Sequence, residues 1–207
     1  MYVGIIGFPC SGEKYVAELL LASGLSDLHG TVSWKALLPE HRPYELVSRQ
    51  PSKEGRKHRV SKNPIPFNPV VHLMRYPWHA ISLAAELPVE DLTLIRDAVG
   101  INAKAPACHL NTWESKVKVL TLAYPKWYDM IRELNPDIML KVEHTDRELV
   151  LQKLLNIVVL YSTLPAFEIG SAKKLVTYET ASAIAGGLAA GQVEVIAKNL
   201  YKRAPVV

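Results

Sequence analysis

The first stretch of the chain whose residue types could do chemistry is GFPCSGEKY, over residues 7–15. Gly7 and Gly12 have the spacing of the two glycines in a Walker A phosphate-binding loop, in which Lys and then Ser or Thr follow the second glycine. Here Glu13 and Lys14 follow Gly12, so the cation is one position late and no hydroxyl is in register for magnesium. The stretch predicts an anion site made by backbone N–H groups, and it weakens the prediction of a magnesium–ATP enzyme.

Arg75 is the second candidate, in the stretch HLMRYPWHAISLAAEL over residues 72–87. It follows the apolar run Val70–Met74, which is typical of a strand that is buried on both faces in a parallel sheet. Ligands of open α/β sheets bind at the carboxyl ends of the strands, where a guanidinium can hold a phosphate through two hydrogen bonds. Ser82 lies about one turn into the helix that follows.

Strands and helices must position these candidates, and the sequence predicts both kinds of element in alternation. β-rich runs predict strands over residues 2–6, 70–74 and 137–142, and a short strand near 59–62. Apolar residues at helical spacing predict helices over 16–23, ended by Gly24, from near Trp78, and over 90–99, 111–123, 126–134, 145–156 and 177–201. Asn111 with Glu114, and Thr145 with Glu148, have the spacing of capping boxes. The last helix is expected to break or bend near Gly186-Gly187 and Gly191.

This alternation predicts a three-layer α/β/α fold with a central parallel sheet. The chain has 207 residues, which fits a single domain over residues 1–207 with a sizeable core. No internal repeat or low-complexity segment divides it.

Composition predicts a soluble globular protein, because 49% of the residues are hydrophobic and 21% are charged. No apolar run reaches the roughly 18 residues of a membrane span, and no signal peptide is expected. With two cysteines, Cys10 and Cys108, a disulfide framework is not predicted. We therefore expect a reducing, cytoplasmic location.

Basic residues gather in one segment, residues 49–62, within a chain of net charge +4. This segment is either a solvated basic loop or a surface that attracts an anionic ligand or substrate. Aromatic interleaving and nucleic-acid-binding motifs are absent from it, so a nucleic-acid partner is not predicted. The residues concerned are Arg49, Lys53, Arg56, Lys57, Arg59 and Lys62, opposed by Glu54.

The two motifs together resemble the sulfotransferase family that uses 3′-phosphoadenosine 5′-phosphosulfate (PAPS), of which this chain would be a divergent member. The family's first loop has the form P-[KR]-S-G-T-[TS]-[WYF]-L. The Arg75 stretch matches the Arg and the Pro of the family's R-[DN]-P-x-D motif. The family's first loop is matched here by Pro9, Cys10, Ser11, Gly12, Glu13, Lys14, Tyr15 and Val16.

Further stretches resemble family segments in the same order, so the resemblance covers most of the chain. Ser61-Lys62-Asn63-Pro64 resembles the E-K-T-P or K-T-H strand before the Arg motif, and Trp113 resembles a Trp in a later helix. Residues 141–144 resemble the R-Y-E-D strand end, and residues 175–201 resemble the closing helix.

The resemblance implies a P-loop NTPase-like fold of the sulfotransferase type and transfer of a sulfuryl group from PAPS to a hydroxyl or amine acceptor. It implies that the first loop, from Pro9 to Tyr15, binds the 5′-phosphosulfate, and that Arg75 and Ser82 hold the 3′-phosphate. Lys14 would lie near the transferred group and Lys62 near the acceptor. The basic segment would favour an anionic small molecule or a carbohydrate as that acceptor.

Several positions depart from the family's pattern. Cys10 replaces the basic residue of the loop, Glu13 replaces its first Thr, and Leu83 stands where the family has its Ser. Ser61 and Pro64 replace the acidic residue or the His of the preceding strand. The candidates for a general base are His58, His72, His79 and Glu143.

Two alternatives stay open. One is a small-molecule or nucleotide P-loop kinase, which would bind ATP with magnesium and for which Lys14 is out of register. The other is a catalytically inactive nucleotide-binding relative, which the departures favour. The seven His residues are scattered and no C-x2-C pair exists, so no metal site is predicted. The sequence does not define the acceptor or the oligomeric state.

Overall fold

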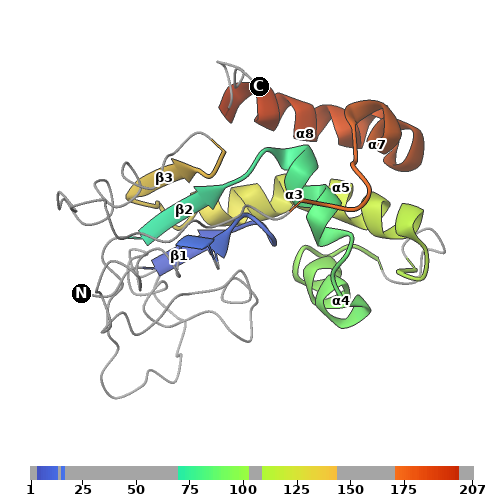
Figure 1. Cartoon of the computed structure of the whole chain (residues 1–207), viewed down its shortest axis with the longest axis horizontal. Helices are drawn as coiled ribbons and strands as arrows, with labels where there is room; N and C mark the ends of the chain where they lie inside the picture. The colour runs from blue at the N-terminus through green and yellow to red at the C-terminus, as the bar shows by residue number, and fades with distance from the viewer. Residues whose placement is uncertain (1–3, 14, 17–69, 103–108, 144–170, 201–207) are drawn as a thin grey trace.

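The computed structural model of the chain describes residues 4–13, 15–16, 70–102, 109–143 and 171–200, and the fold is given for these residues. They form three strands and five helices, arranged as Figure 1 shows. The strands are β1 (Gly4–Gly7), β2 (Val70–Met74) and β3 (Ile138–Lys141). The helices are α3 (Pro77–Ala84), α4 (Val89–Ala98), α5 (Trp113–Arg132), α7 (Tyr178–Ala185) and α8 (Gly187–Leu200).

The three strands form a parallel sheet in the order β1-β2-β3. Ile6 lies opposite His72, and His72 lies opposite Met139. Because all three strands run in the same direction, their carboxyl ends meet at one edge of the sheet. The predictions of an α/β fold, a parallel sheet and these three strands are confirmed. The loop after β1 and the Arg after β2 therefore begin from neighbouring positions.

Helix α5 is one continuous helix, where the sequence predicted two amphipathic stretches over 111–123 and 126–134. Its N-cap is Thr112, whose side chain accepts from the Ser115 backbone N–H at 3.1 Å, so the capping box is not the predicted Asn111–Glu114 pair. Pro125 lies inside the helix and removes one backbone hydrogen bond. The helix continues because its buried stripe does not change face, running through Val117, Leu120, Tyr124, Trp127 and Ile131.

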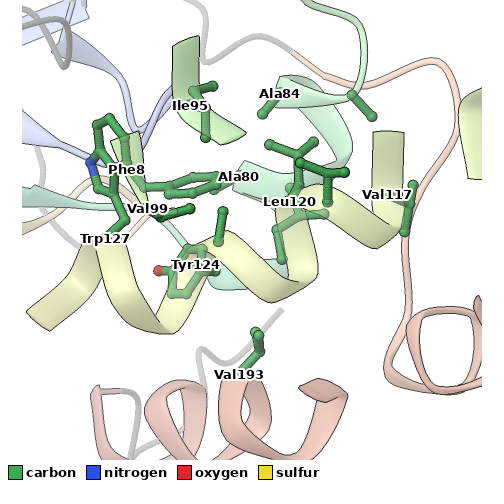
Figure 2. Close-up of a cluster of buried hydrophobic side chains, with 14 of the residues drawn as sticks. Phe8, Ala80, Ala84, Ile95, Val99, Val117, Leu120, Tyr124, Trp127 and Val193 are labelled. Atoms are coloured by element: carbon green, nitrogen blue, oxygen red, sulfur yellow. The ribbon is translucent and has the colours of Figure 1, made fainter. Parts of the chain in front are cut away.

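The core gathers around α5, which lies behind the strands in Figure 1 and contacts β1, α3, α4, α7 and α8. Phe8, the first residue after β1, packs against Tyr124 with ring centroids 4.6 Å apart, as Figure 2 shows. The indole N–H of Trp127 donates to the Gly7 carbonyl at 3.1 Å. These contacts fix the end of β1, and hence the start of the loop, against α5.

The C-terminal helices are separated at Gly186, whose φ of 92° ends α7 before α8 begins at Gly187. This confirms the predicted break at the glycine pair, because only glycine adopts such a φ at little cost. The expected second bend at Gly191 is wrong, since α8 runs through it to Leu200. The indole N–H of Trp78 on α3 donates to Glu194 on α8 at 2.9 Å and ties the two helices together.

Several predicted segments lie outside the described residues. They are the strand near 59–62, most of the helix over 16–23, the helix over 145–156, and the basic segment 49–62. The extent of the domain over residues 1–207, the third layer and the P-loop-like topology stay predictions. Within the described ranges, no helix combines the length and the apolar character that a membrane crossing requires.

Candidate functional site

The loop after β1 is a tight turn that leads directly into helical backbone. The Ser11 backbone N–H donates to the Phe8 carbonyl at 3.0 Å, and helical conformation begins at Glu13. Cys10 has a φ of 66° and Gly12 a φ of 101°, both in the left-handed region. A non-glycine residue rarely adopts this conformation, so Cys10 marks a backbone that its surroundings constrain.

At both Gly7 and Gly12, close packing leaves little room for a side chain. A Cβ on Gly7 would lie 2.7 Å from the Leu73 carbonyl oxygen of the neighbouring strand. A Cβ on Gly12 would lie 3.1 Å from a methyl group of Val142, which follows β3. The loop is thus pressed against the carboxyl ends of both other strands, and its glycine spacing follows from this close approach.

Arg75 lies over this loop, as the order of the strands requires. It is buried, with 7% of its surface exposed. Its Nη1 donates to the Cys10 carbonyl oxygen at 3.4 Å, and its Nε lies 3.8 Å from Oε1 of Glu143. The two motifs singled out in the sequence, about 65 residues apart, therefore meet at one edge of the sheet.

Glu143 is the acidic partner at this edge, two residues beyond β3. Its Oε1 accepts from the Tyr76 backbone N–H at 2.8 Å and lies 3.9 Å from Nδ1 of His79. Glu143 and His79 were named in the sequence only as candidate bases. The pairing of Glu143 with Arg75 was not predicted, because periodicity carries no signal for a contact between residues so far apart.

Glu13 is the second carboxyl group at this edge of the sheet, and it lies within the loop after β1. Its Oε1 is buried, has no hydrogen-bond partner within the described structure, and would lie 3.3 Å from a Cβ placed on Gly7. Burial raises the pKa of this carboxyl to about 7, opposed by the backbone N–H groups of Glu13 and Gly12 and by the charge of Arg75. The side chain therefore folds back over the first glycine, where the nearby backbone amides favour its charged form.

Cys10 does not have the properties of a nucleophile. Burial, and then the charge of Glu13, raise the pKa of its thiol to about 12, so the thiolate is scarce at neutral pH. What Cys10 offers at this edge is its backbone carbonyl, which accepts from Arg75.

Ser82, an expected phosphate ligand, is used inside the fold instead. It has no exposed surface, donates to the Trp78 carbonyl at 2.5 Å and accepts from the Val176 backbone N–H at 2.7 Å. A hydroxyl that both donates and accepts in a closed environment holds α3 to the segment before α7. We therefore assign Ser82 a structural role and leave it out of the site.

The other expected site residues are distributed unevenly. Pro9 is buried in the loop and Tyr15 is partly exposed at the start of the helix, while Lys14 and Lys62 lie outside the described residues. Of the candidate bases, His58 also lies outside them. His72 is 3% exposed and packs on Tyr128 of α5, with ring centroids 5.7 Å apart, which places it within the core. His79 and Glu143 remain at the carboxyl edge.

Comparisons with known proteins do not assign the chain to a protein class. No protein-family model matches the chain, and neither a curated protein nor a solved structure matches it. Among the described residues, no group of three or more His, Cys, Asp or Glu side chains lies close enough together to hold a metal ion. The site is therefore defined by the loop 8–13, Arg75, His79 and Glu143.

Proposed function

We propose that this chain is a divergent P-loop-like protein of the sulfotransferase type, which binds PAPS at the carboxyl edge of its sheet and transfers the sulfuryl group to a hydroxyl or amine acceptor. The observation that carries the proposal is the hydrogen bond from Arg75 Nη1 to the Cys10 carbonyl, at 3.4 Å. It joins the phosphate-loop motif on β1 to the Arg motif on β2. Parallel α/β sheets bind ligands at this edge.

The donors at this edge fit an anionic nucleotide once the Glu13 side chain leaves the loop. The backbone N–H groups of Gly12 and Glu13 would hold the 5′-phosphate, as at other loop-to-helix transitions. Arg75 would hold the 3′-phosphate through its guanidinium, which also bonds the Cys10 carbonyl. PAPS, when bound, would supply an activated sulfuryl group. An anionic small molecule or a carbohydrate is the acceptor class that we propose.

His79 is the described residue best placed to accept a proton from an acceptor hydroxyl. Its side chain is 49% exposed, and its Nδ1 faces Glu143 at 3.9 Å. A proton on Nδ1 would be stabilised by that carboxylate, which leaves Nε2 free to take the acceptor's proton. Arg75, held by Glu143 and Cys10, would keep the loop and the helix α3 in register while this happens.

A second candidate function is nucleotide binding without catalysis. The neutral thiol of Cys10 favours it, because sulfuryl transfer needs cations to neutralise charge on the leaving phosphate and the resembled family has a basic residue at this position. This candidate shares the ligand with the first and differs only in turnover. No described contact favours the kinase alternative over either.

The test is the dependence of binding on Arg75. Calorimetry would compare adenosine 3′,5′-bisphosphate with adenosine 5′-monophosphate, on the parent chain, on Arg75→Lys and on Arg132→Lys. Arg132, 67% exposed on α5, is the matched control for the same chemical change. We expect the parent to prefer the bisphosphate, and Arg75→Lys to lose about tenfold or more in affinity because Lys cannot make two parallel bonds. Equal binding by Arg75→Lys and the parent would contradict the assignment.

A further inference from the structure

Both places where the proposed ligand would put its phosphates are next to a carboxyl group of the chain itself. Glu13 lies within the loop after β1, and Glu143 lies against Arg75 at the end of β2. Glu143 has an evident structural task, since it also accepts from the Tyr76 backbone N–H at 2.8 Å. Glu13 has no comparable task, because its Oε1 is buried without a hydrogen-bond partner in the described part of the chain.

A buried acceptor atom without a partner costs free energy, so the position of Glu13 calls for a reason. The Glu13 Oε1 lies inside the loop, 3.3 Å from the position of a Cβ on Gly7, and the backbone amides of Gly12 and Glu13 and the charge of Arg75 favour the charged form of this carboxyl group. These are the donors that an anion in the loop would use. The side chain is thus in the place of the anion and not beside it.

We propose that Glu13 is the specificity-determining residue of this site: its carboxyl group substitutes for the ligand's phosphate in the loop, and an anion binds only by displacing it. This inference rests on the proposed function in one respect, since it takes the loop as the position of a phosphate. It explains why a loop with two glycines at phosphate-loop spacing carries an acid where the resembled family has a threonine. The acid holds the loop closed without ligand and sets the affinity that a ligand must exceed.

The pH dependence of binding follows from the same displacement. Buried in the loop, the Glu13 carboxyl has a pKa raised to about 7, whereas a displaced side chain in water returns to an ordinary value near 4.5. A raised pKa in the closed loop means that protonation favours the closed loop. Anion binding, which needs the loop open, therefore weakens as the pH falls below about 7. The other titratable or charged described groups that face this carboxyl are Cys10 in the loop and Arg75, with Glu143 and His79 around Arg75.

Inorganic sulfate is the probe for this test, because its charge stays constant across the relevant pH range. Sulfate binding would be measured by calorimetry on the parent chain, Glu13→Ala, Glu13→Gln and the control Glu90→Ala, which removes the same charge from an exposed position of α4. We expect Glu13→Ala to bind sulfate about tenfold or more tightly than the parent, and Glu90→Ala to bind as the parent does. Thermal melts identify a variant that has failed to fold, and Glu13→Gln, which keeps the shape without the charge, then serves as the second variant.

The pH series gives an independent readout. Relative to Glu13→Ala, the parent should lose sulfate affinity between about pH 8 and about pH 5, and this ratio removes the contribution of every group that the two proteins share. Equal sulfate affinity of the parent and both Glu13 variants would overturn the inference, as would a parent whose relative affinity rises at low pH. The latter result would mean that a protonated Glu13 stays in the loop beside the anion.

Failure of this inference and failure of the proposed function give different patterns. If Glu13→Ala gains sulfate affinity but neither protein binds adenosine 3′,5′-bisphosphate, the displacement is supported and the nucleotide is wrong. If the bisphosphate binds the parent and Glu13→Ala equally well, the nucleotide site is supported and the displacement is wrong.

Discussion

Arg75 and Glu143 stand just beyond the ends of neighbouring strands and meet across the edge of the sheet, with Nε of Arg75 3.8 Å from Oε1 of Glu143. Arg75 also donates to the carbonyl of Cys10, which lies beyond the end of β1, the other neighbour of β2. One guanidinium therefore joins the three chain segments that leave the carboxyl ends of the sheet. The proposed ligand site and the stability of this edge depend on the same residue.

Replacing Arg75 with Ala should therefore destabilise the fold as well as the site. It removes the guanidinium beside the Glu143 carboxyl group, whose side chain is 18% exposed, although the Tyr76 N–H remains. Breaking such a largely buried pair costs about 2–4 kcal/mol of unfolding free energy. Urea unfolding of Arg75→Ala would be compared with Arg132→Ala, whose exposed pair with Asp129 should cost less than about 0.5 kcal/mol. Similar losses in the two variants would contradict the bridging role of Arg75.

Replacing a glycine with alanine should lower the stability of the protein at Gly7, which lies close to β2, and raise it at Gly191, which lies in open space. Gly7→Ala puts a Cβ 2.7 Å from the Leu73 carbonyl, which must shift, whereas a Cβ on Gly191 meets nothing within 4 Å. Gly7→Ala should cost about 2 kcal/mol or more through strain at the loop. Gly191→Ala should stabilise α8 by about 0.5–1 kcal/mol through its higher helix propensity. Thermal unfolding of both variants measures this, and a stable Gly7→Ala protein would mean that the loop is not tightly packed.

The Ser82→Ala variant tests whether Ser82 has a structural role or binds the ligand. Ser82→Ala leaves the buried Val176 N–H without an acceptor, which should cost about 1–3 kcal/mol of stability. Thr93 is only partly buried and makes a similar, exposed bond to its i−4 carbonyl at 2.8 Å, so Thr93→Ala should cost about 0.5 kcal/mol or less. The affinity of folded Ser82→Ala for adenosine 3′,5′-bisphosphate should equal that of the parent. A selective loss of that affinity, with unchanged stability, would restore Ser82 as a phosphate ligand.

The buried His72 should make the free energy of unfolding decrease at acidic pH. Burial lowers the pKa of this imidazole from 6.5 to about 4, so the unfolded chain takes up the proton first as the pH falls. The stabilisation by neutral His72 is complete above about pH 6.5 and is lost progressively toward about pH 4, to a total of up to about 3 kcal/mol. Urea unfolding across this range should show a steeper loss for the parent than for His72→Leu. The exposed His109 supplies the control, and a His109→Leu variant that flattens the slope equally would refute this account.

The parallel sheet was predictable because apolar runs such as Val70–Met74 carry a strong local signal. The limits of α5 were harder to predict, since the apolar spacing indicated two stretches, over 111–123 and 126–134, and Pro125 lies between them. One lost backbone hydrogen bond is a local cost, while the stripe from Val117 to Ile131 stays buried on a single face. Tertiary burial outweighed the local signal, and the cap moved to Thr112, the residue next to the expected one.

The site was predictable in its position but not in its side-chain arrangement. The spacing of Gly7 and Gly12, and the place of Arg75 after a buried strand, were sufficient to indicate two segments at one edge. Whether Glu13 points out of the loop or into it depends on its approach to Gly7 of β1 and on the charge of Arg75, which no periodicity encodes. The same holds for Ser82, whose hydroxyl is used by Val176, 94 residues later in the chain.

The central claim is that the carboxyl edge of this sheet binds a nucleotide with phosphates at both the 3′ and the 5′ positions. Calorimetric titration of the purified chain with adenosine 3′,5′-bisphosphate at about pH 8, where Glu13 is least able to stay protonated in the loop, tests it most directly. ATP with magnesium would be titrated in parallel. The account predicts binding of the bisphosphate with a Kd on the order of micromolar and no comparable binding of ATP. Binding of ATP alone, or of neither nucleotide, would contradict it.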